Sequence, residues 1–320
     1  MIRIRYATDI EECERAWRQA IPVETIWDIW EVRECFDRHY RRSRLFIIAE
    51  DRHRIVGLLP LSRLETDNDF GYFPGETWNG KTWIEQNRIV AQDEIILRMM
   101  LDHCPGNYHL RYLTDSGVMN TASLPVDETG YLFYPSRYDF NIESYYNEFS
   151  HKSLKRILKS ASALITRGAK FRFDDMADFD ALVSLNLSRY ETRSYFHDMR
   201  FRESFREVAQ FLQNNGWLRI TTVTIDGRPV AVDIGSTFNG TYALLAGGTD
   251  GEFPGIAKLI NLRHIEWACE QKFKEVDFLC GEFSWKPMFH LSPRQLFLLS
   301  GKSAVLRKAK TVSRRMTHAG

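Results

Sequence analysis

The chain has 320 residues, of which 44% are apolar, and its 43 basic and 42 acidic side chains leave a formal net charge of +1. This length can bury a sizeable core and is more typical of two domains than of one. The near-neutral charge excludes a global attraction to nucleic acid or to an anionic membrane, so any electrostatic role must be local.

The cysteines and the first residues indicate where the protein works. The 5 cysteines are odd in number and form no CxxC pair, which favours free thiols in a reducing compartment. Residues 1–6 alternate Ile with Arg and lack the apolar core of a signal peptide. No apolar run approaches the roughly 20 residues that a membrane-spanning helix needs. The sequence therefore predicts a cytoplasmic protein.

The first half of the chain alternates short strands with helices. Residues 2–6 predict a strand, and Asp9 is placed to cap a helix that runs through Ala20. The other expected elements are a hairpin (45–49 and 55–61), a loop rich in Gly and aromatic residues (67–87), a helix (89–104) and a strand (108–113). This pattern indicates a mixed α/β unit.

The chain changes character near residue 140, where we expect a domain boundary. A basic amphipathic helix at 150–167 ends at Gly168, the residue type that most often stops a helix in the left-handed conformation. A strand at 170–173 and helical patterns at 176–190 and 202–214 follow. Both halves can follow one plan, helix pairs and then a meander and a helix, which suggests a degenerate tandem duplication.

The most informative segment is a strand meander that leads through a glycine-containing loop into a helix. The strand-like runs are 218–225, 230–238 and 242–247, the loop is 248–255, the helix lies near 256–272, and a short apolar strand follows at 275–279. A helix N-terminus presents unpaired amides and a partial positive charge, and glycines let a diphosphate approach the backbone. A plain strand-to-helix turn is the alternative.

The strand after this helix is expected to lie parallel beside the last meander strand. The splay between two such strands would form a slot in which a pantetheine arm can hydrogen-bond like another strand, with its diphosphate on the helix start.

Short motifs occur in a fixed order across roughly residues 140–300. They are SLKR at 153–156, SYF at 194–196 with RF at 200–201, the meander at 223–237, FPG at 253–255, and VDFLCGE at 276–282 with Lys286. On these motifs, the second half resembles the GNAT-fold acetyltransferases of the CelD-like group, which is associated with cellulose and exopolysaccharide biosynthesis. It is more distantly similar to the FemAB-type aminoacyl transferases.

The resemblance implies an α/β fold of tandem GNAT-like domains, with mixed and mostly antiparallel sheets flanked by helices. It implies a degenerate GNAT-like domain at 1–139, an acyltransferase domain at 140–300 and a basic tail at 301–320. It also implies acetyl-CoA or another acyl-CoA as co-substrate. The residues expected to bind it are Leu244, Leu245, Ala246, Gly248, Gly251, Gly255, Ile256 and Ala257.

The diphosphate loop departs from the pattern of the family. Typical members carry Q/R-x-x-G-x-G/A, whereas residues 250–255 read DGEFPG. Glu252 in this loop would repel a diphosphate unless its side chain points away.

An amine must be neutral to attack a thioester, so a proton acceptor is expected near the acyl carbon. Glu282 is the first candidate, because it lies just past the end of the 276–279 strand, where ligands of open α/β sheets bind. Asp277, inside that strand, is placed to line the same slot. Tyr242 is a candidate proton donor to the leaving thiolate. For each of these residues, a structural role in capping or packing is the alternative.

The acceptor site is expected beside the meander and at the end of the 176–190 helix. Asp233 shares a strand face with the small residues Ala231 and Gly235, which fits a substrate floor and fits an edge-exposed face nearly as well. The predicted acceptor-binding residues are Arg189, Tyr190, Asp233 and Lys286. His264 and His290 lie in no metal-ligand motif and are interpreted as structural or surface residues, so no metal is expected.

The leading hypothesis is an acyl-CoA-dependent N-acyltransferase that transfers an acyl group, typically acetyl, directly to an amine in a ternary complex. The acceptor would be an amino sugar, an amino acid, or an envelope or polysaccharide precursor, with backbone amides at 244–246 polarising the acyl oxygen.

Two other hypotheses stay open. The basic helix at 150–167 favours FemAB-like transfer from aminoacyl-tRNA, the one case in which nucleic acid would be a partner. The irregular diphosphate loop favours a non-catalytic scaffold in a polysaccharide or secretion system. The basic tail is either a peripheral contact with an anionic membrane or a solvated terminus.

Overall fold

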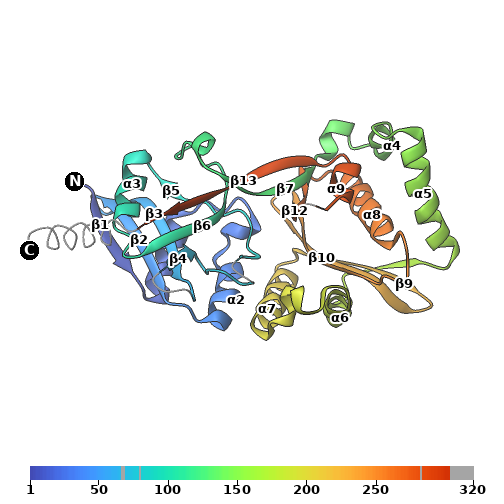
Figure 1. Ribbon diagram of the computed structural model, residues 1–320, viewed down its shortest axis with the longest axis horizontal. Helices are drawn as coiled ribbons and strands as arrows, with labels where there is room; N and C mark the ends of the chain where they lie inside the picture. The colour runs from blue at the N-terminus through green and yellow to red at the C-terminus, as the bar shows by residue number, and fades with distance from the viewer. Residues whose placement is uncertain (66–68, 79–80, 282, 303–320) are drawn as a thin grey trace, which may run out of the picture. The chain divides into compact units, whose positions relative to one another are not determined.

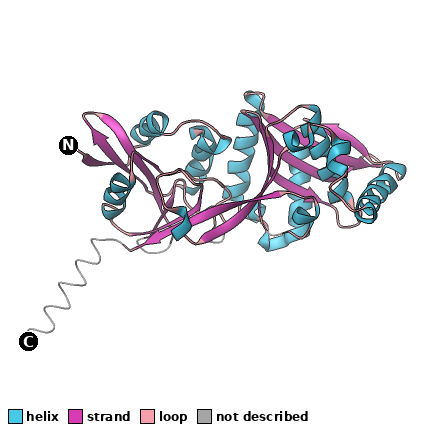
Figure 2. Ribbon diagram, turned by 90° about the horizontal axis from the view of Figure 1, so that it is seen from above, coloured by secondary structure: helices cyan, strands magenta, loops and turns pink. Residues whose placement is uncertain are grey.

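The computed structural model describes residues 1–65, 69–78, 81–281 and 283–302. The chain divides into two compact units (Figure 1). Unit 1 contains Met1–Thr129 and Gln295–Gly320, and unit 2 contains Gly130–Arg294. Residues 295–300, which the sequence placed at the end of the second domain, thus group with unit 1. In each unit, helices flank strands that form a mixed sheet (Figure 2).

Unit 1 is built on the strand order β1-β2-β3-β4-β6-β13, with β5 paired to β3. Its strands are β1 (Arg3–Ala7), β2 (Arg44–Asp51), β3 (Arg54–Arg63), β4 (Asp69–Tyr72), β5 (Val90–Ala91), β6 (Asn107–Leu113) and β13 (Ser292–Gly301). Its helices are α1 (Ile10–Ala20), α2 (Trp30–Tyr40) and α3 (Glu94–Asp102). The predicted cap of α1 is confirmed, because the Asp9 carboxylate accepts from the amides of Glu11 and Glu12.

The helix predicted at 89–104 is shorter at its start than expected. Asp93 caps α3 by accepting from the amide of Ile96 at 2.9 Å, so the helix begins at Glu94. The apolar residues before the cap pair with Gly57 and Leu58 of β3 instead. Periodicity alone could not separate this short strand from the helix.

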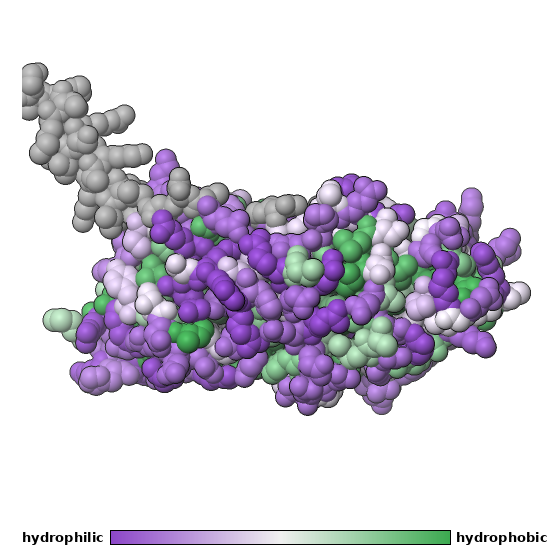
Figure 3. Space-filling model, turned by 90° about the horizontal axis from the view of Figure 1, so that it is seen from below, coloured by the Kyte–Doolittle hydropathy of each residue, from purple (hydrophilic) through white to green (hydrophobic). Residues whose placement is uncertain are grey.

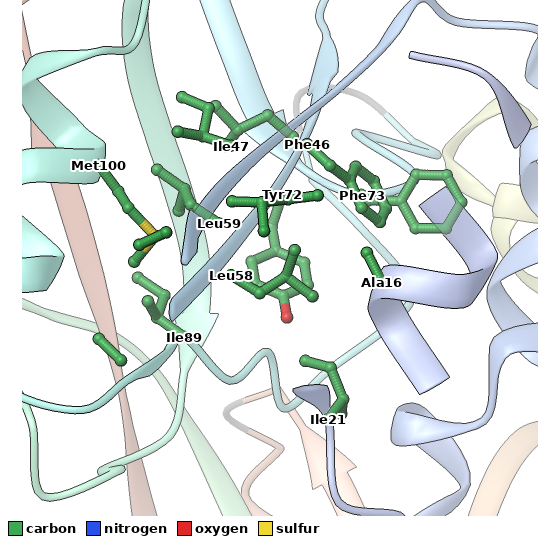
Figure 4. Packing of buried hydrophobic residues seen from close by; sticks show 14 of the residues in the cluster. Ala16, Ile21, Phe46, Ile47, Leu58, Leu59, Tyr72, Phe73, Ile89 and Met100 are labelled. Carbon is green, nitrogen blue, oxygen red and sulfur yellow. The ribbon is translucent and has the colours of Figure 1, made fainter. Parts of the chain in front are cut away.

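The core of unit 1 is dense in aromatic side chains. Trp30 stacks on Phe73 with ring centroids 5.1 Å apart, and Phe46 meets Phe73 edge to face at 5.3 Å. Figure 4 shows Phe46 and Ile47 of β2, Leu58 and Leu59 of β3, and Met100 of α3 around one apolar interior. The burial of these large side chains joins the helices to the sheet of unit 1.

Unit 2 carries the predicted meander, and its strand order is β7-β12-β11-β10-β9-β8. Its strands are β7 (Val126–Phe133), which begins in unit 1, β8 (Lys170–Phe173), β9 (Leu218–Ile225), β10 (Arg228–Phe238), β11 (Thr241–Thr249) and β12 (Glu275–Cys280). Its helices are α4 (Ile142–Tyr146), α5 (His151–Thr166), α6 (Asp178–Tyr190), α7 (Met199–Asn214), α8 (Ile256–Glu270) and α9 (Trp285–Met288). The predicted α/β class and the meander are confirmed.

The local signals that start and stop α5 also act as predicted. The Ser150 side chain caps the helix by accepting from the amide of Ser153, and Gly168 takes a positive φ of 96° just after its end. Glycine adopts this conformation without the steric cost that a Cβ would add.

Candidate active site

The parallel strands β11 and β12 part partway along their length. They pair at Thr241↔Glu275, Tyr242↔Val276 and Ala243↔Asp277. Beyond Ala243, the described register of β11 continues to Thr249 on the side of β10, while β12 pairs with β7 at Cys280. The predicted parallel neighbour of the last meander strand is therefore present, and the two strands separate beside residues 244–249.

Both strands bend where they separate. Ile234 of β10 pairs with Ala246, and the next residue, Gly235, pairs with Leu244, so Leu245 is an extra residue on β11. A bulge of this kind bends its strand and increases the local twist. On the other side, the register of β12 is irregular between Asp277 and Cys280.

The loop after β11 brings the N-terminus of α8 against α5. Gly255 has a φ of 95°, and a Cβ added there would overlap the hydroxyl of Ser160 on α5. Among the residues that the structure describes, no side chain caps the first turn of α8. Glycine is therefore required at this position both by the backbone conformation and by the neighbouring helix.

Acidic side chains of this loop turn toward an arginine of β10. The Arg228 guanidinium donates to the Asp250 carboxylate at 2.9 Å and lies 3.6 Å from that of Glu252. Glu252 remains 79% exposed. This ion pair offsets part of the repulsion that Glu252 would exert on a diphosphate.

Arg189 lies beside this loop. A Cβ added to Gly251 would be 3.5 Å from an Nη atom of Arg189, which comes from the end of α6. The sequence assigned Arg189 and Tyr190 to the acceptor. The structure brings the guanidinium next to the loop predicted to hold a diphosphate, because α6 lies along β10 and β11 and ends near the loop that follows β11.

A chain of buried polar groups connects α8 with the meander. His264 Nε2 lies 2.8 Å from Asp233 Oδ2, and its Nδ1 lies 3.0 Å from the Tyr242 hydroxyl. Tyr242 is fully buried, and burial raises the pKa of its hydroxyl far above the ordinary value, with the Asp233 charge adding to the shift. The side chain predicted to protonate a thiolate is thus committed to His264.

Asp277 and Lys286 hold the end of β12. The Asp277 carboxylate accepts from the amide of Leu279 at 2.9 Å and from Arg294 at 2.7 Å. Lys286 Nζ donates to the carbonyls of Leu279 and Cys280, each at 2.8 Å. Both side chains are 1% exposed, so their described bonds serve this strand end and not an acceptor in solvent. Glu282, the first candidate base, lies outside the described residues.

Two contributors were missed by the sequence analysis. His264 falls on the helical stripe of Ile256 and Ile260, and this spacing alone could have placed it in the interior. Asn186 of α6 donates to the carbonyl of Gly247 at 2.8 Å and accepts from Ser194 at 2.6 Å. These bonds fix α6 against the part of β11 that has left β12.

Figure 3 shows that hydrophilic residues cover most of the displayed face of the described surface. No helix in the described part of the chain is both long and apolar enough to cross a membrane. Within residues 1–65, 69–78, 81–281 and 283–302, no group of three or more His, Cys, Asp or Glu side chains could hold a metal ion.

Residues 151–287 match the family described as "Acetyltransferase (GNAT) domain". A search of curated protein sequences finds no match. The solved structures with similar folds include FemX, at a TM-score of 0.60 and 9% identity, covering 94% of this chain and 98% of that one. L-PGS from Bacillus licheniformis gives a TM-score of 0.58 at 9% identity, covering 93% and 92% of the two chains.

A tandem GNAT protein from the clavulanic acid biosynthesis pathway gives a TM-score of 0.51 at 11% identity, covering 94% of this chain and 98% of that one. At these identities the structures show the fold alone. The family match gives residues 151–287 a GNAT acetyltransferase domain, which implies an N-acyltransferase, and the solved structures agree with its α/β fold.

Proposed function

We propose that unit 2 binds an acyl-CoA between β11 and β12 and transfers its acyl group to an amine, in a cytoplasmic setting. The acceptor we propose is an amino sugar, an amino acid, or an envelope or polysaccharide precursor. The observation that carries this proposal is the separation of β11 and β12 after Ala243. From Leu244 to Thr249, the edge of β11 that faces β12 lies outside the described pairing of these two strands. A pantetheine arm has amide groups that can bond along such an edge.

The corresponding place in unit 1 supports the assignment of the donor to unit 2. There β4 and β6 are also parallel neighbours, paired at Asp69↔Asn107 and Phe70↔Tyr108 and separated in sequence by a helix. Where these strands part, Asn87 bridges to Leu113, donates to the Tyr112 carbonyl at 2.8 Å and accepts from the Thr114 amide at 2.9 Å. In unit 1, the backbone at Asn87 thus occupies the space where β4 and β6 separate.

The charges around the loop 250–255 fit the phosphates of the donor. The uncapped first turn of α8 supplies a partial positive charge, and Arg189 adds a full one beside Gly251. The acyl group would then lie near the bulge at Leu245, where backbone amides polarise its carbonyl. Direct attack by the amine in a ternary complex follows from this arrangement.

Isothermal titration with acetyl-CoA and CoA tests the proposal. A charge placed at Gly255 would also disturb α5, whereas a side chain at Gly251 meets only Arg189 at an ordinary contact distance. We therefore expect Gly251→Glu to weaken binding at least about tenfold by repelling the diphosphate, and Gly251→Gln, its neutral match, to weaken it much less. Binding that is absent in the intact protein, or equal in both variants, contradicts the proposal.

Aminoacyl transfer is the second candidate, and α5 is the observation that favours it. Its exposed face carries Lys152, Lys155, Arg156 and Lys159, and FemX shares the fold. Total tRNA is the probe that separates the two functions. Binding of tRNA that weakens steeply with salt and is lost when these four residues are changed to Gln favours aminoacyl transfer. Binding of acetyl-CoA without tRNA binding favours acyl-CoA as the donor.

A further inference from the structure

The polar chain under α8 is buried at one end and accessible at the other. His264 is 1% exposed and Tyr242 is fully buried, but the Asp233 side chain is 13% exposed. Buried polar groups of this kind are costly unless every donor and acceptor is paired. The arrangement therefore has to be explained both by its internal bonds and by the oxygen that reaches the surface.

The internal bonds run in a single direction. A neutral imidazole has one donor nitrogen and one acceptor nitrogen. When Tyr242 donates to Nδ1, the proton of His264 is on Nε2 and is donated to Asp233 Oδ2. Tyr242 and His264 thus both orient their donors toward one carboxylate.

The second oxygen of Asp233 lies over the exposed Gly247. Asp233 and Gly247 are directly paired in the sheet, and a Cβ added to Gly247 would overlap Asp233 Oδ1. Among the described residues, no hydrogen bond to Oδ1 is present. Gly247 follows Ala246, the end of the 244–246 segment proposed to polarise the acyl carbonyl. This oxygen belongs to a side chain that is 13% exposed, and it lies two residues along β11 from Leu245, near which the acyl group is proposed to bind.

We propose that Asp233 is the general base of the acyl transfer and that His264 and Tyr242 position it; this inference rests on the proposed acyl-CoA function. The ammonium group of the acceptor first gives a proton to Asp233 Oδ1, and the lone pair of the resulting neutral amine then attacks the acyl carbon. The carbon–sulfur bond breaks, the thiolate of CoA leaves, and the second proton lost by the amine nitrogen passes through solvent to the thiolate. Asp233 then returns its proton to solvent.

Two other charged side chains near Tyr242, His264 and Asp233 affect the pKa of Tyr242. Arg219 of β9 lowers the pKa of Tyr242 by charge, whereas Asp174, which follows β8, raises it. Arg219 also lies over the Trp267 ring of α8 at 4.0 Å and donates to Asp174 at 2.9 Å. These two charges thus act on the pKa of Tyr242 in opposite directions.

Thiol release from acetyl-CoA with two nucleophiles tests the base. Glucosamine is largely an ammonium ion at neutral pH and needs a proton acceptor, whereas hydroxylamine is already neutral. We expect Asp233→Asn to lower kcat with glucosamine about 10²- to 10⁴-fold and with hydroxylamine less than about tenfold. The affinity for acetyl-CoA should not change. Asp180→Asn is the matched control, since Asp180 is an exposed carboxylate of α6 paired with Arg206.

Tyr242→Phe tests the positioning role. It removes one hydroxyl and leaves the ring, so we expect a roughly tenfold fall in kcat with glucosamine at unchanged KM. The acidic limb of the pH profile should move to higher pH, because weaker donation through His264 stabilises the carboxylate less. A merely structural role would leave that limb in place. Circular dichroism and thermal unfolding establish that each variant folds.

The outcomes separate this inference from the proposed function. Failure of the intact protein to bind acetyl-CoA overturns both. If Asp233→Asn binds acetyl-CoA and still transfers to glucosamine at the full rate, only the role of Asp233 as the base is overturned. The same holds if the intact protein binds acetyl-CoA but releases thiol to neither nucleophile, or to hydroxylamine alone. Nitrogen-15 NMR is an independent test, because it reports which ring nitrogens of His264 carry a proton. A cationic His264, or one protonated on Nδ1, contradicts the proposed donation from Tyr242 through His264 to Asp233.

Discussion

Each unit contains a pair of neighbouring parallel strands, β4 and β6 in unit 1 and β11 and β12 in unit 2, but the polar groups beside the two pairs differ. In unit 1, Arg33 is buried beside the space between β4 and β6 and donates to the carbonyls of Trp27 and Phe73 at 2.6 Å each and to the Asn87 side chain at 2.9 Å. In unit 2, the described polar series of Tyr242, His264 and Asp233 ends on Asp233, whose side chain is 13% exposed and lies at Gly247. A closed polar cluster stabilises a fold, whereas an open one is available to a ligand.

The largest effect is expected from breaking the closed cluster of unit 1. Arg33→Met leaves three buried acceptors without their donor, and each such loss costs about 1–3 kcal/mol. We expect the free energy of unfolding to fall by about 3–5 kcal/mol in urea titrations. Arg15→Met, which removes a 70%-exposed arginine of the neighbouring helix α1, should cost less than about 0.5 kcal/mol. Similar costs for both variants contradict the comparison.

The cysteines sharpen the same contrast through their reactivity. Burial raises the pKa of the Cys104 thiol in unit 1 and of Cys269 in unit 2, each to about 11. Only about one thiol in a thousand would then be ionised at about pH 8. Cys280 is half-buried at the end of β12.

We expect iodoacetamide to alkylate Cys280 at least about 100-fold faster than Cys104 or Cys269 in the native protein, as read by peptide mass spectrometry. Saturating CoA should slow the reaction at Cys280. Equal labelling of the buried thiols and Cys280 in the folded protein would sink this prediction.

Two glycines of the loop region distinguish packing from binding in unit 2. A Cβ on Gly248 would lie 2.9 Å from both the Leu182 carbonyl and the Leu185 Cβ of α6. Gly248→Ala should therefore lower stability by about 1–3 kcal/mol through overpacking. Gly251→Ala, which meets only Arg189 at 3.5 Å, should stay within about 0.5 kcal/mol of the intact protein in the same unfolding measurement.

The smallest effect is expected at an exposed pair on α8. Arg263 donates twice to the Glu270 carboxylate, which holds the pKa of Glu270 below its ordinary value of 4.5. Glu270 is 50% exposed, so solvent screening limits the contribution of the pair to about 0.5 kcal/mol.

Because this pKa is lowered in the folded state, the stabilisation is present above the pKa of the unfolded chain and is lost as pH falls through the folded value. Arg263→Gln should therefore cost stability at neutral pH but not in acid. The measurement is urea unfolding across pH, with Arg98→Gln of the exposed pair with Glu94 in unit 1 as a control. A cost that persists at low pH indicates lost packing instead.

The order of elements could be predicted because the signals are local. Asp9 and Ser150 cap helices through amides only two or three residues away, and the alternation of the meander strands needs no distant partner. The parallel neighbour of β11 followed from this order, whereas the tandem GNAT-like class was implied by the family resemblance. The predicted start of α3 was wrong because residues 90–91 form a short strand that pairs with β3, whose residues are distant in sequence.

The roles of single side chains could not be predicted in the same way. Lys286 is a cation in sequence, yet it turns inward because two carbonyls at the end of β12 accept its protons. Arg189 was placed at the acceptor but lies beside Gly251. His264 of α8 contacts Asp233 of β10 and Tyr242 of β11, and no short sequence motif contains all three residues.

The sequence by itself determined the elements, the class of fold and the strand pair beside which a donor is proposed to bind, since period, caps and glycine turns act over a few residues. Only the tertiary structure decided which slot is filled and which carboxylate oxygen is left accessible. The physical reason is that hydrogen bonds over long sequence separations, such as that of Asn87 with Tyr112 and that of His264 with Asp233, exist only once the sheet has brought their partners together.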